Sequence, residues 1–363
     1  MGLHGLYERF GRRRKAAVST ERRKAEHIRI SLEEPVAGQG VTTGLERYRF
    51  IHNALPEVDF HEIDLSSRFL GKPLKAPLVI SSMTGGTAEA GVINRHLAGA
   101  AERCGWAMGV GSVRAAIEQP ELAATFRVRE AAPTIPLFAN LGAVQLNYGY
   151  GPEECRRAVE LLEADGLVLH LNALQEVFQP EGNTNFRSLL GRIEAVCSAL
   201  TVPVGVKEVG WGIDGATARR LLDAGVHFID VAGAGGTSWS EVEKRRAGTD
   251  ALRREAADAF ADWGLPTAAC VRDVRRLAPG AFVVASGGLA TGVDAAKAIA
   301  LGANLAGFGR GLLAAAVDGE AAVERVLERV AFELRAAMFG IGARSVAELR
   351  GTPALVPAAS LLP

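Results

Sequence analysis

Excess charge of one sign, cysteine and long apolar runs are all scarce in this sequence. Lys and Arg together number 41, as do Asp and Glu, so the 363-residue chain has a formal net charge of +0. This balance argues against a chain-wide surface for nucleic acid or for a membrane. The sequence has no long uninterrupted apolar run, so it does not predict a membrane-spanning helix. The N-terminus carries Arg residues where a secretory signal needs an apolar segment.

The cysteines exclude two further classes of protein. Cys104, Cys155, Cys197 and Cys270 show no C-x-x-C spacing, so neither a disulfide framework nor a zinc site is indicated. We therefore expect a reducing, cytoplasmic location. The composition, 48% apolar and 23% charged, is that of a globular protein. The length allows two domains, but it also suits a single α/β barrel.

The N-terminal region is rich in basic residues. Nine of them lie between residues 9 and 29, against only Glu21 and Glu26. Such a run is typical of a solvated arm, and we predict a disordered tail over residues 1–19. A helix start is expected near Thr20. No linker divides the remainder, so we predict one domain over 20–363.

From residue 76 a unit repeats: a short apolar run, a small or polar cluster, and then an amphipathic helical stretch. The eight runs are 77–82, 106–111, 136–142, 166–172, 203–208, 227–233, 281–288 and 304–310. The helical stretches include 88–104, 152–164, 187–200, 214–224, 252–263, 291–301 and 319–338. Apolar strands alternating with helices indicate a parallel sheet, and eight such units predict a (β/α)8 TIM barrel. The strands span about residues 77 to 310, C-terminal helices follow to about 350, and the N-terminal segment caps the barrel.

One interval between runs is longer than the others. The sixth and seventh runs end 55 residues apart, near 232 and 287, whereas the other intervals are 22 to 36 residues. This leaves room for a loop over 234–250, which we expect to act as a lid or binding loop. A doubly wound sheet is the competing fold. It would need a G-x-G-x-x-G fingerprint after the first strand, where 82–86 reads SMTGG.

Polar or glycine residues follow every predicted strand. They include Ser82, Met83, Thr84, Ser112, Arg114, Asn140, His170, Asn172, Gln175, Glu176, Lys207, Glu208, residues 233–237, Gly287, Gly288, Gly309 and Arg310. A single residue of this kind is usually a buried polar group whose hydrogen bonds are made within the protein. Eight sets at one end of a barrel are better explained as a ring around a ligand.

Two of these sets predict a phosphate site. Residues 286–288 and 309–311 follow the seventh and eighth strands, where backbone N–H groups bind phosphate in many barrels. Ordinary turn glycines are the alternative. Lys207 ends the fifth strand, where it would be costly to bury without an anionic or electron-rich partner such as a flavin. A Schiff-base lysine is the competing interpretation. Together these features are typical of FMN-binding barrels.

Longer motifs resemble those of type 2, FMN-dependent isopentenyl-diphosphate isomerases, from about Thr20 to Leu349. They are R-K-x-x-H-I (23–28), S-M-T-G-G (82–86), G-x-G-S-x-R (109–114), A-N-L-G-A (139–143), H-L-N-x-x-Q-E (170–176), Q-P-E-G (179–182), V-K-E (206–208) and A-G-x-G-G-T-S-W-x-x-x-E (232–243). The sequence departs from the family's pattern at Ala173, where proline is common, and in its Arg-rich residues 1–19.

The resemblance implies a role for each group of residues. FMN would be held by Ser82, Met83, Thr84, Gly85, Ser112, Asn140, Lys207, Thr237, Gly287, Gly288, Leu289, Gly309 and Arg310. The substrate would be held by Arg23, Lys24, His27, Ser112, Val113, Arg114, His170, Asn172 and Gln175. Glu176 would hold Mg²⁺. The implied activity interconverts isopentenyl and dimethylallyl diphosphate, with NADPH as the flavin reductant, and we expect a homotetramer or homooctamer.

The residues themselves suit this chemistry. Arg23, Lys24 and Arg114 supply three positive charges for a diphosphate, and Mg²⁺ on Glu176 adds two. Moving a double bond requires protonation at one carbon and deprotonation at another, and reduced FMN is the implied acid and base. Gln175 is expected to position or relay the proton. Glu243 and Trp239 are candidates for proton handling and for shielding a cationic state.

Three other functions compete. An FMN-dependent 2-hydroxy-acid oxidase needs a His base near the loops after strands six or seven, yet no histidine follows His227. An inosinate-type dehydrogenase needs a cysteine in the glycine-rich loop 233–239, which has none. A non-catalytic phosphate-binding barrel would not need Gln175, Glu176 and Lys207.

Overall fold

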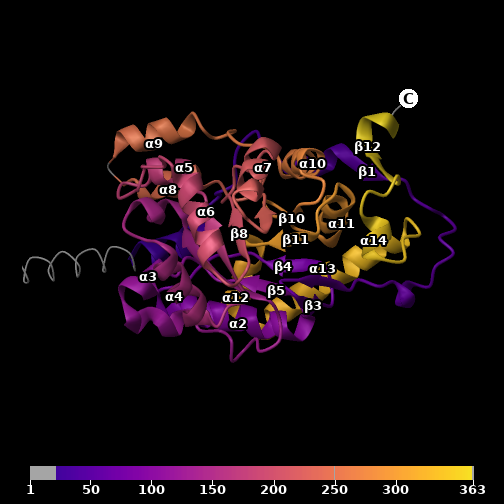
Figure 1. The fold of residues 1–363 in the computed structure, drawn as a ribbon. Coiled ribbons are helices and arrows are strands. Elements are labelled where there is room, and N and C mark those ends of the chain that lie inside the picture. The colour runs from indigo at the N-terminus through magenta and orange to yellow at the C-terminus, as the bar shows by residue number, and fades with distance from the viewer. Residues whose placement is uncertain (1–21, 249, 362–363) are drawn as a thin grey trace, which may run out of the picture.

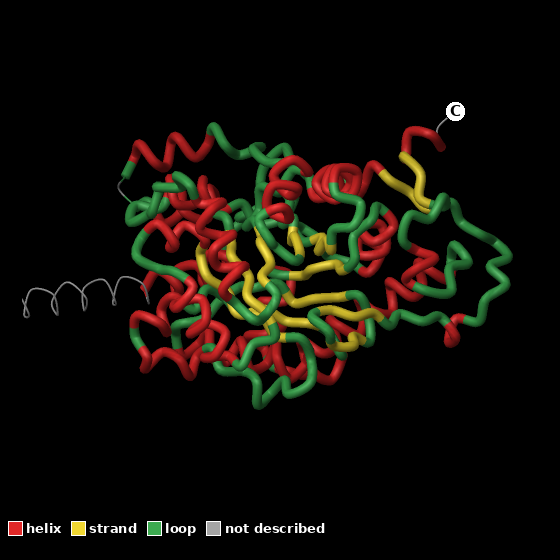
Figure 2. The backbone as a smooth tube through the Cα atoms, in the orientation of Figure 1, coloured by secondary structure: helices red, strands yellow, loops and turns green. Residues whose placement is uncertain are grey.

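A computed structural model describes residues 22–248 and 250–361, so the predicted tail over 1–19 lies outside the described part of the chain. Eight parallel strands form a closed barrel in the order β10-β11-β4-β5-β6-β7-β8-β9 (Figures 1 and 2). They are β4 (Leu78–Ile80), β5 (Ala107–Gly109), β6 (Leu137–Gly142), β7 (Gly166–His170), β8 (Val204–Lys207), β9 (Phe228–Asp230), β10 (Phe282–Ala285) and β11 (Leu305–Phe308). Each lies inside one predicted run, so the predicted (β/α)8 barrel is confirmed.

Helices surround the barrel (Figure 2). They are α2 (Ala88–Cys104), α3 (Arg114–Glu118), α4 (Pro152–Leu162), α5 (Ala173–Phe178), α6 (Leu189–Ala199), α7 (Gly215–Asp223), α8 (Trp239–Arg246), α9 (Ala251–Asp258), α10 (Thr267–Leu277), α11 (Gly292–Ala300), α12 (Leu313–Asp318), α13 (Glu320–Phe339) and α14 (Val346–Leu349). Among the described residues no helix is long and apolar enough to cross a membrane.

The segment between β9 and β10 differs from its prediction. Residues 234–250 were expected to form a loop, but 239–246 are the helix α8. The helix expected over 252–263 is the shorter α9, and the helix that packs on β10 is α10, which the sequence analysis did not identify. The polar sequence of α8 predicts an exposed loop. In the structure, however, four of its residues are buried: Ser240, Glu241, Val242 and Glu243.

The longest of the barrel's early helices, α2, has clear end signals in its sequence. The Thr87 side chain caps its start by accepting a hydrogen bond from the Ala90 N–H. Gly105 ends it in a left-handed conformation (φ 66°), which glycine adopts without steric cost. Ile93 and Leu97 are buried on the face toward the barrel, and α2 coincides with the predicted stretch 88–104.

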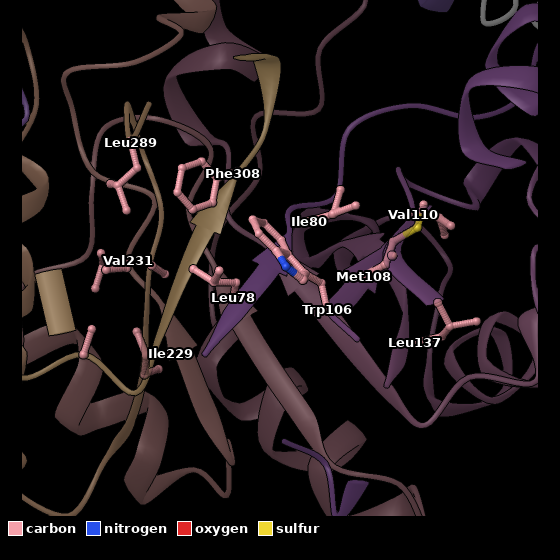
Figure 3. Close-up of a cluster of buried hydrophobic side chains, with 14 of the residues drawn as sticks. Leu78, Ile80, Trp106, Met108, Val110, Leu137, Ile229, Val231, Leu289 and Phe308 are labelled. Carbon is pink, nitrogen blue, oxygen red and sulfur yellow. The ribbon is translucent and has the colours of Figure 1, made fainter. Parts of the chain in front are cut away.

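The apolar layer between strands and helices holds the barrel together. Trp106, directly before β5, is fully buried beside Ile80, Leu78 and Phe308, and its ring lies 5.6 Å from that of Phe308 (Figure 3). Truncating a buried aromatic of this size costs about 3–5 kcal/mol. This packing fixes the strand ends that carry the polar residues.

The N-terminal end of the barrel is closed by aromatic side chains. A hairpin of β2 (Ser67–Phe69) and β3 (Lys72–Leu74) inserts Phe69 among Phe138, Phe228 and Phe282, with ring centroids 5.0 to 6.1 Å away. Gly205 makes room for this plug, because a Cβ there would lie 2.1 Å from the Phe228 ring. These side chains fill one end of the barrel, so a ligand site is expected at the opposite end.

The predicted capping segment lies over that opposite end. Its described helical part, residues 22–33, is called the cap helix below. Ile30 and Val36 pack against Val242 and Trp239, which ties the cap helix and the residues after it to α8. The Ser238 N–H donates to the Val36 carbonyl at 2.7 Å. A separate strand pair, β1 (Tyr48–Phe50) with β12 (Leu355–Pro357), joins early and late parts of the chain.

Candidate active site

A cavity of about 420 Å³ lies at the carboxyl ends of the barrel strands, beneath the cap helix. Most of the predicted site residues line it. These are Arg23, Lys24, His27, Ser82, Met83, Thr84, Ser112, Arg114, Asn140, His170, Asn172, Gln175, Glu176, Lys207, Thr237, Trp239, Gly287, Gly288, Leu289, Gly309 and Arg310. The parallel barrel brings all the strand ends to one edge, which explains how residues so far apart in sequence meet there.

Three predicted residues do not lie on the cavity wall. Gly85 is buried against Phe126, whose ring would be 2.0 Å from a Cβ at this position. Val113 is buried, and its N–H donates to the Asn140 carbonyl at 2.9 Å. Glu243 is fully buried and contacts the wall only through neighbouring side chains.

The sequence analysis missed several residues of the wall. Ser81 adjoins the predicted Ser82, and Gln179 begins the quoted Q-P-E-G motif, so local signals existed for both. Ser286, which also lines the cavity, belongs to the segment 286–288 of the predicted phosphate site. Gln145 also lines the cavity, but it follows β6 without a distinctive pattern. The Oγ atoms of Ser81 and Ser82 are buried and lack a partner among the described residues. Such atoms at a cavity wall are suited to a polar ligand.

One end of the cavity is a backbone cradle, formed by Gly287, Gly288 and Gly309. Gly287 and Gly288 have φ values of 103° and 80°, which favour glycine. A Cβ at Gly287 would lie 2.1 Å from the Gly233 carbonyl oxygen. No described residue accepts a hydrogen bond from the N–H of Gly287, Gly288 or Gly309. Converging free N–H groups form an anion site, as predicted for a phosphate.

Lys207 lies at the end of β8 and is buried. Burial holds the pKa of its ammonium group below the usual value, although Asp230 and Glu208 favour the charged form. Its Nζ donates to the Glu208 carbonyl at 2.5 Å. Asp230 faces Lys207 across the β8–β9 pair and accepts from the Ser286 Oγ at 2.6 Å. Lys207 thus lines the cavity with two acidic residues near its ammonium group, where a ligand can contact it.

His170 is fixed as a neutral acceptor. Its Nδ1 lies 2.7 Å from the Asn140 Oδ1, which can only accept, so Nδ1 carries the proton. Burial, together with the charges of Lys207 and Lys24, lowers the pKa of His170 to about 3. The free Nε2 therefore accepts hydrogen bonds from a ligand but adds no positive charge.

The other end of the cavity is a cluster of cations formed by Arg23, Lys24 and Arg114. The Lys24 Nζ donates to the Ser112 carbonyl at 3.0 Å and lies 4.8 Å from the centre of the Phe126 ring. Burial, followed by the charges of Arg23 and Arg114, lowers the pKa of Lys24 to about 7. A buried cluster of positive side chains of this kind forms a site for an anion, because an anion nearby favours their charged forms.

Among the described residues that line the cavity, Glu176 is the single acidic one. Its Oε1 accepts from the Asn172 Nδ2 at 2.8 Å, and its Oε2 accepts from the Asn183 N–H at 2.5 Å. The buried Oδ1 of Asn172 has no partner among the described residues. The described part of the chain contains no group of three His, Cys, Asp or Glu residues arranged for a metal. A cation here would take one protein carboxylate and obtain its other ligands from substrate and water, as Mg²⁺ commonly does.

A buried network lies behind the wall around Glu243. Its Oε1 accepts from the His27 Nε2 at 2.9 Å and from the Gln175 Nε2 at 3.3 Å, and its Oε2 accepts from Arg246. Burial alone would raise the pKa of Glu243, but the hydrogen bond from His27 and the nearby charges hold it below its usual value. The Trp239 ring lies edge-on to His27, with centroids 5.0 Å apart. Of the predicted trio, Gln175 and Glu243 are therefore in direct contact, and Trp239 is linked to them through His27.

Comparisons with known proteins agree with this geometry. The profile of the family described as FMN-dependent dehydrogenase matches residues 168–356. A relative named isopentenyl-diphosphate delta-isomerase from Oceanobacillus iheyensis is 56% identical over 91% of this chain and 94% of its own length. Relatives of the same name from Nostoc sp. and Rickettsia prowazekii are 54% and 46% identical over 93% and 90% of this chain, and over 97% and 95% of their own lengths.

Solved structures share the architecture at low identity. A mandelate oxidase with (S)-2-phenylpropionate aligns with a TM-score of 0.61 and 22% identity, covering 92% of this chain and 96% of that one. A mutant flavocytochrome b2 with pyruvate bound aligns with a TM-score of 0.67 and 18% identity, covering 93% and 85%. These likenesses show the barrel fold alone. The curated relatives, in contrast, exceed 45% identity over nine-tenths of the chain, and so the chain belongs to the isopentenyl-diphosphate delta-isomerase family.

Proposed function

We propose that this chain interconverts isopentenyl diphosphate and dimethylallyl diphosphate, using reduced FMN, in isoprenoid biosynthesis. The observation that carries the proposal is that one cavity has two separate anion sites. The glycine cradle suits a single phosphate, and the cation cluster of Arg23, Lys24 and Arg114 suits a more highly charged group. A cofactor with a phosphate and a substrate with a diphosphate would fill both.

The wall suits FMN at the cradle end. Gly287, Gly288, Leu289, Gly309 and Arg310 would hold its phosphate. Ser82, Met83 and Thr84, with Ser112, Asn140, Lys207 and Thr237, would surround its ring, and the unpartnered Oγ of Ser82 supports this placement. When bound and reduced, FMN supplies a group that can give and take a proton. We propose NADPH as the reductant.

The other end suits the diphosphate and Mg²⁺. Arg23, Lys24 and Arg114 would neutralise the diphosphate, with His27, His170 and Ser112 beside them. Glu176, held in place by Asn172, would contribute one carboxylate oxygen to Mg²⁺, which would also bind diphosphate oxygens. Gln175, which precedes Glu176 on α5, would lie near the alkene and the diphosphate.

The remaining groups handle protons and exclude water. His27 donates its Nε2–H to the Glu243 Oε1, and Gln175 donates to the same oxygen, so Glu243 is oriented toward the cavity by two wall residues. We propose that this network relays the proton and that the Trp239 ring shields the developing cation. Both roles require the cap helix to stay in place, because His27 belongs to it.

The test combines a spectrum with an assay. Purified protein should show a flavin absorption band, and after reduction with NADPH it should convert isopentenyl diphosphate in the presence of Mg²⁺. A colourless protein would favour a non-catalytic phosphate-binding barrel. Flavin reduction by 2-hydroxy acids would favour an oxidase, although among the described wall residues both histidines, His27 and His170, precede β9. Light scattering should give the mass of a tetramer or an octamer.

A further inference from the structure

Arg246 connects three parts of the chain behind the cavity wall. Its side chain is only 8% exposed, and it contacts three carboxylates. Its Nε lies 3.2 Å from the Glu26 Oε2 of the cap helix, and an Nη lies 3.1 Å from the Glu181 Oε1 in the loop after α5. The third carboxylate is Glu243, one turn earlier on α8.

Two of these carboxylates also contact residues of the cavity wall. The Glu181 Oε1 lies 3.6 Å from an Nη of Arg23, which belongs to the cation cluster. The Oε1 of Glu243, the oxygen that does not contact Arg246, accepts hydrogen bonds from His27 and Gln175. Arg246 itself does not line the cavity. One buried cation is therefore a single contact away from both halves of the proposed substrate site.

We propose that Arg246 is a positioning residue that docks the cap helix through Glu26 and Glu181 and holds Glu243 ionised in its contacts with His27 and Gln175. The inference rests on the proposed function, because the residues that it positions are those proposed to bind the substrate and handle the proton. Arg246 acts only through these neighbours and touches no reacting atom.

The charges around Glu243 give the sign of the expected change. His27 and Arg23 face it from the cap helix, Arg246 faces it from its own helix, and Gln175 of α5 is uncharged. Arg246 favours the ionised form of Glu243 and disfavours the charged form of His27. Its removal should raise the pKa of both groups, since one positive charge no longer opposes protonation.

The neighbouring Arg245 provides a matched control. Its guanidinium lies 3.7 Å from the Glu34 Oε2, donates to the Pro35 carbonyl at 2.5 Å, and pairs with Glu241 at 2.8 Å. It therefore also joins α8 to the segment after the cap helix, but it contacts neither Glu243 nor Arg23. Arg245→Gln removes a comparable charge without disturbing the proposed connection.

The experiment compares Arg246→Gln, Arg246→Lys and Arg245→Gln in the FMN-loaded full-length protein. For Arg246→Gln we expect a rise in KM of about tenfold or more, the factor of one charge-assisted hydrogen bond, together with a lower kcat. The pH–rate profile should shift upward and flavin content should stay unchanged. Arg246→Lys should restore part of the loss, and Arg245→Gln should keep the pH profile of the parent protein.

A second measurement needs no turnover. NMR titration of the His27 ring in the substrate-free protein, assigned with His27→Gln, should give a higher pKa in Arg246→Gln and an unchanged one in Arg245→Gln. An unchanged His27 titration in Arg246→Gln, or an equal shift in Arg245→Gln, would overturn the inference whether or not the protein is an isomerase. Failure of the isomerase assay with the expected titration would instead count against the proposed function.

Glu181→Gln covers the case in which Arg246→Gln does not fold. This change removes the carboxylate that Arg23 and Arg246 share but keeps the contact between Arg246 and Glu243. It should raise KM and leave the pH profile in place. A KM equal to that of the parent would show that Glu181 does not position Arg23.

Discussion

The two anion sites of the cavity are formed by different kinds of chemical group. The cradle at β10 and β11 consists of backbone N–H groups on glycines, within loops fixed by buried strands. The cation cluster consists of long side chains, two of them from the cap helix. A backbone site gains affinity from fixed geometry, whereas a side-chain site gains it from charge and can open with the element that carries it. The difference suits a resident cofactor at one end and an exchanging substrate at the other.

The largest expected effect comes from removing charge at the substrate end. The double substitution Arg23→Ala with Lys24→Ala should raise KM by about 100-fold or more, because two charge-assisted contacts are lost. Flavin content, measured from the absorbance ratio, should not change. Removal of residues 1–19 is the control and should leave KM as it is. Loss of FMN in the double variant would contradict the separation of the two sites.

Lys207→Ala tests the cofactor end. The loss of one charge-assisted contact should weaken FMN binding by about 10- to 100-fold and destabilise the reduced, anionic ring. Flavin titration of the apoprotein and a measured reduction potential would check both effects. Lys297→Ala, on the outer helix α11, is a suitable control for the loss of a lysine. An unchanged potential would mean that Lys207 does not face the ring.

Glu176→Gln sharpens the assignment within the substrate end. The amide keeps the size of the side chain but lowers its affinity for a hard cation, so the Mg²⁺ concentration for half-maximal activity should rise several-fold. The flavin should remain bound. Glu118→Gln, which removes a carboxylate that pairs with Arg114 outside the cavity wall, serves as the comparison. A normal Mg²⁺ dependence in Glu176→Gln would place the metal on the diphosphate alone.

The smallest effect concerns the protonation of Lys24. With a pKa of about 7, Lys24 is mostly neutral in the free protein above that pH. A bound diphosphate favours its charged form, so binding should take up a proton there, and affinity should fall as the pH rises above about 7. Calorimetry in buffers of different ionisation enthalpy measures the uptake. In Lys24→Arg, whose side chain stays charged, the uptake should disappear.

The sequence predicted the barrel well, because buried parallel strands are continuous apolar runs that stand out in any sequence. It also predicted most of the wall, since the ends of those strands must meet at one edge. The family motifs then identified Arg23 and Lys24, whose place over the mouth no local pattern reveals.

The sequence could not predict contacts that only the assembled fold creates. The polar segment Trp239–Arg246 was expected to be a loop. Its Glu243 and Arg246 are nevertheless buried, because Glu243 pairs with the cap helix and Arg246 pairs with both the cap helix and the loop after α5. No sequence pattern indicated a role for Arg246, because its three partners are 3, 65 and 220 positions away in the chain. The helix α10 was overlooked because α9, in the same interval, had already supplied an amphipathic stretch.

The pairing of β1 with β12 bears on how the protein is made. Tyr48 lies opposite Pro357, so a strand synthesised early has its partner more than 300 residues later. During synthesis on the ribosome, residues 48–50 cannot pair until residues 355–357 have emerged, which is after all eight barrel strands. During synthesis, the eighth barrel strand therefore emerges before this strand pair can form.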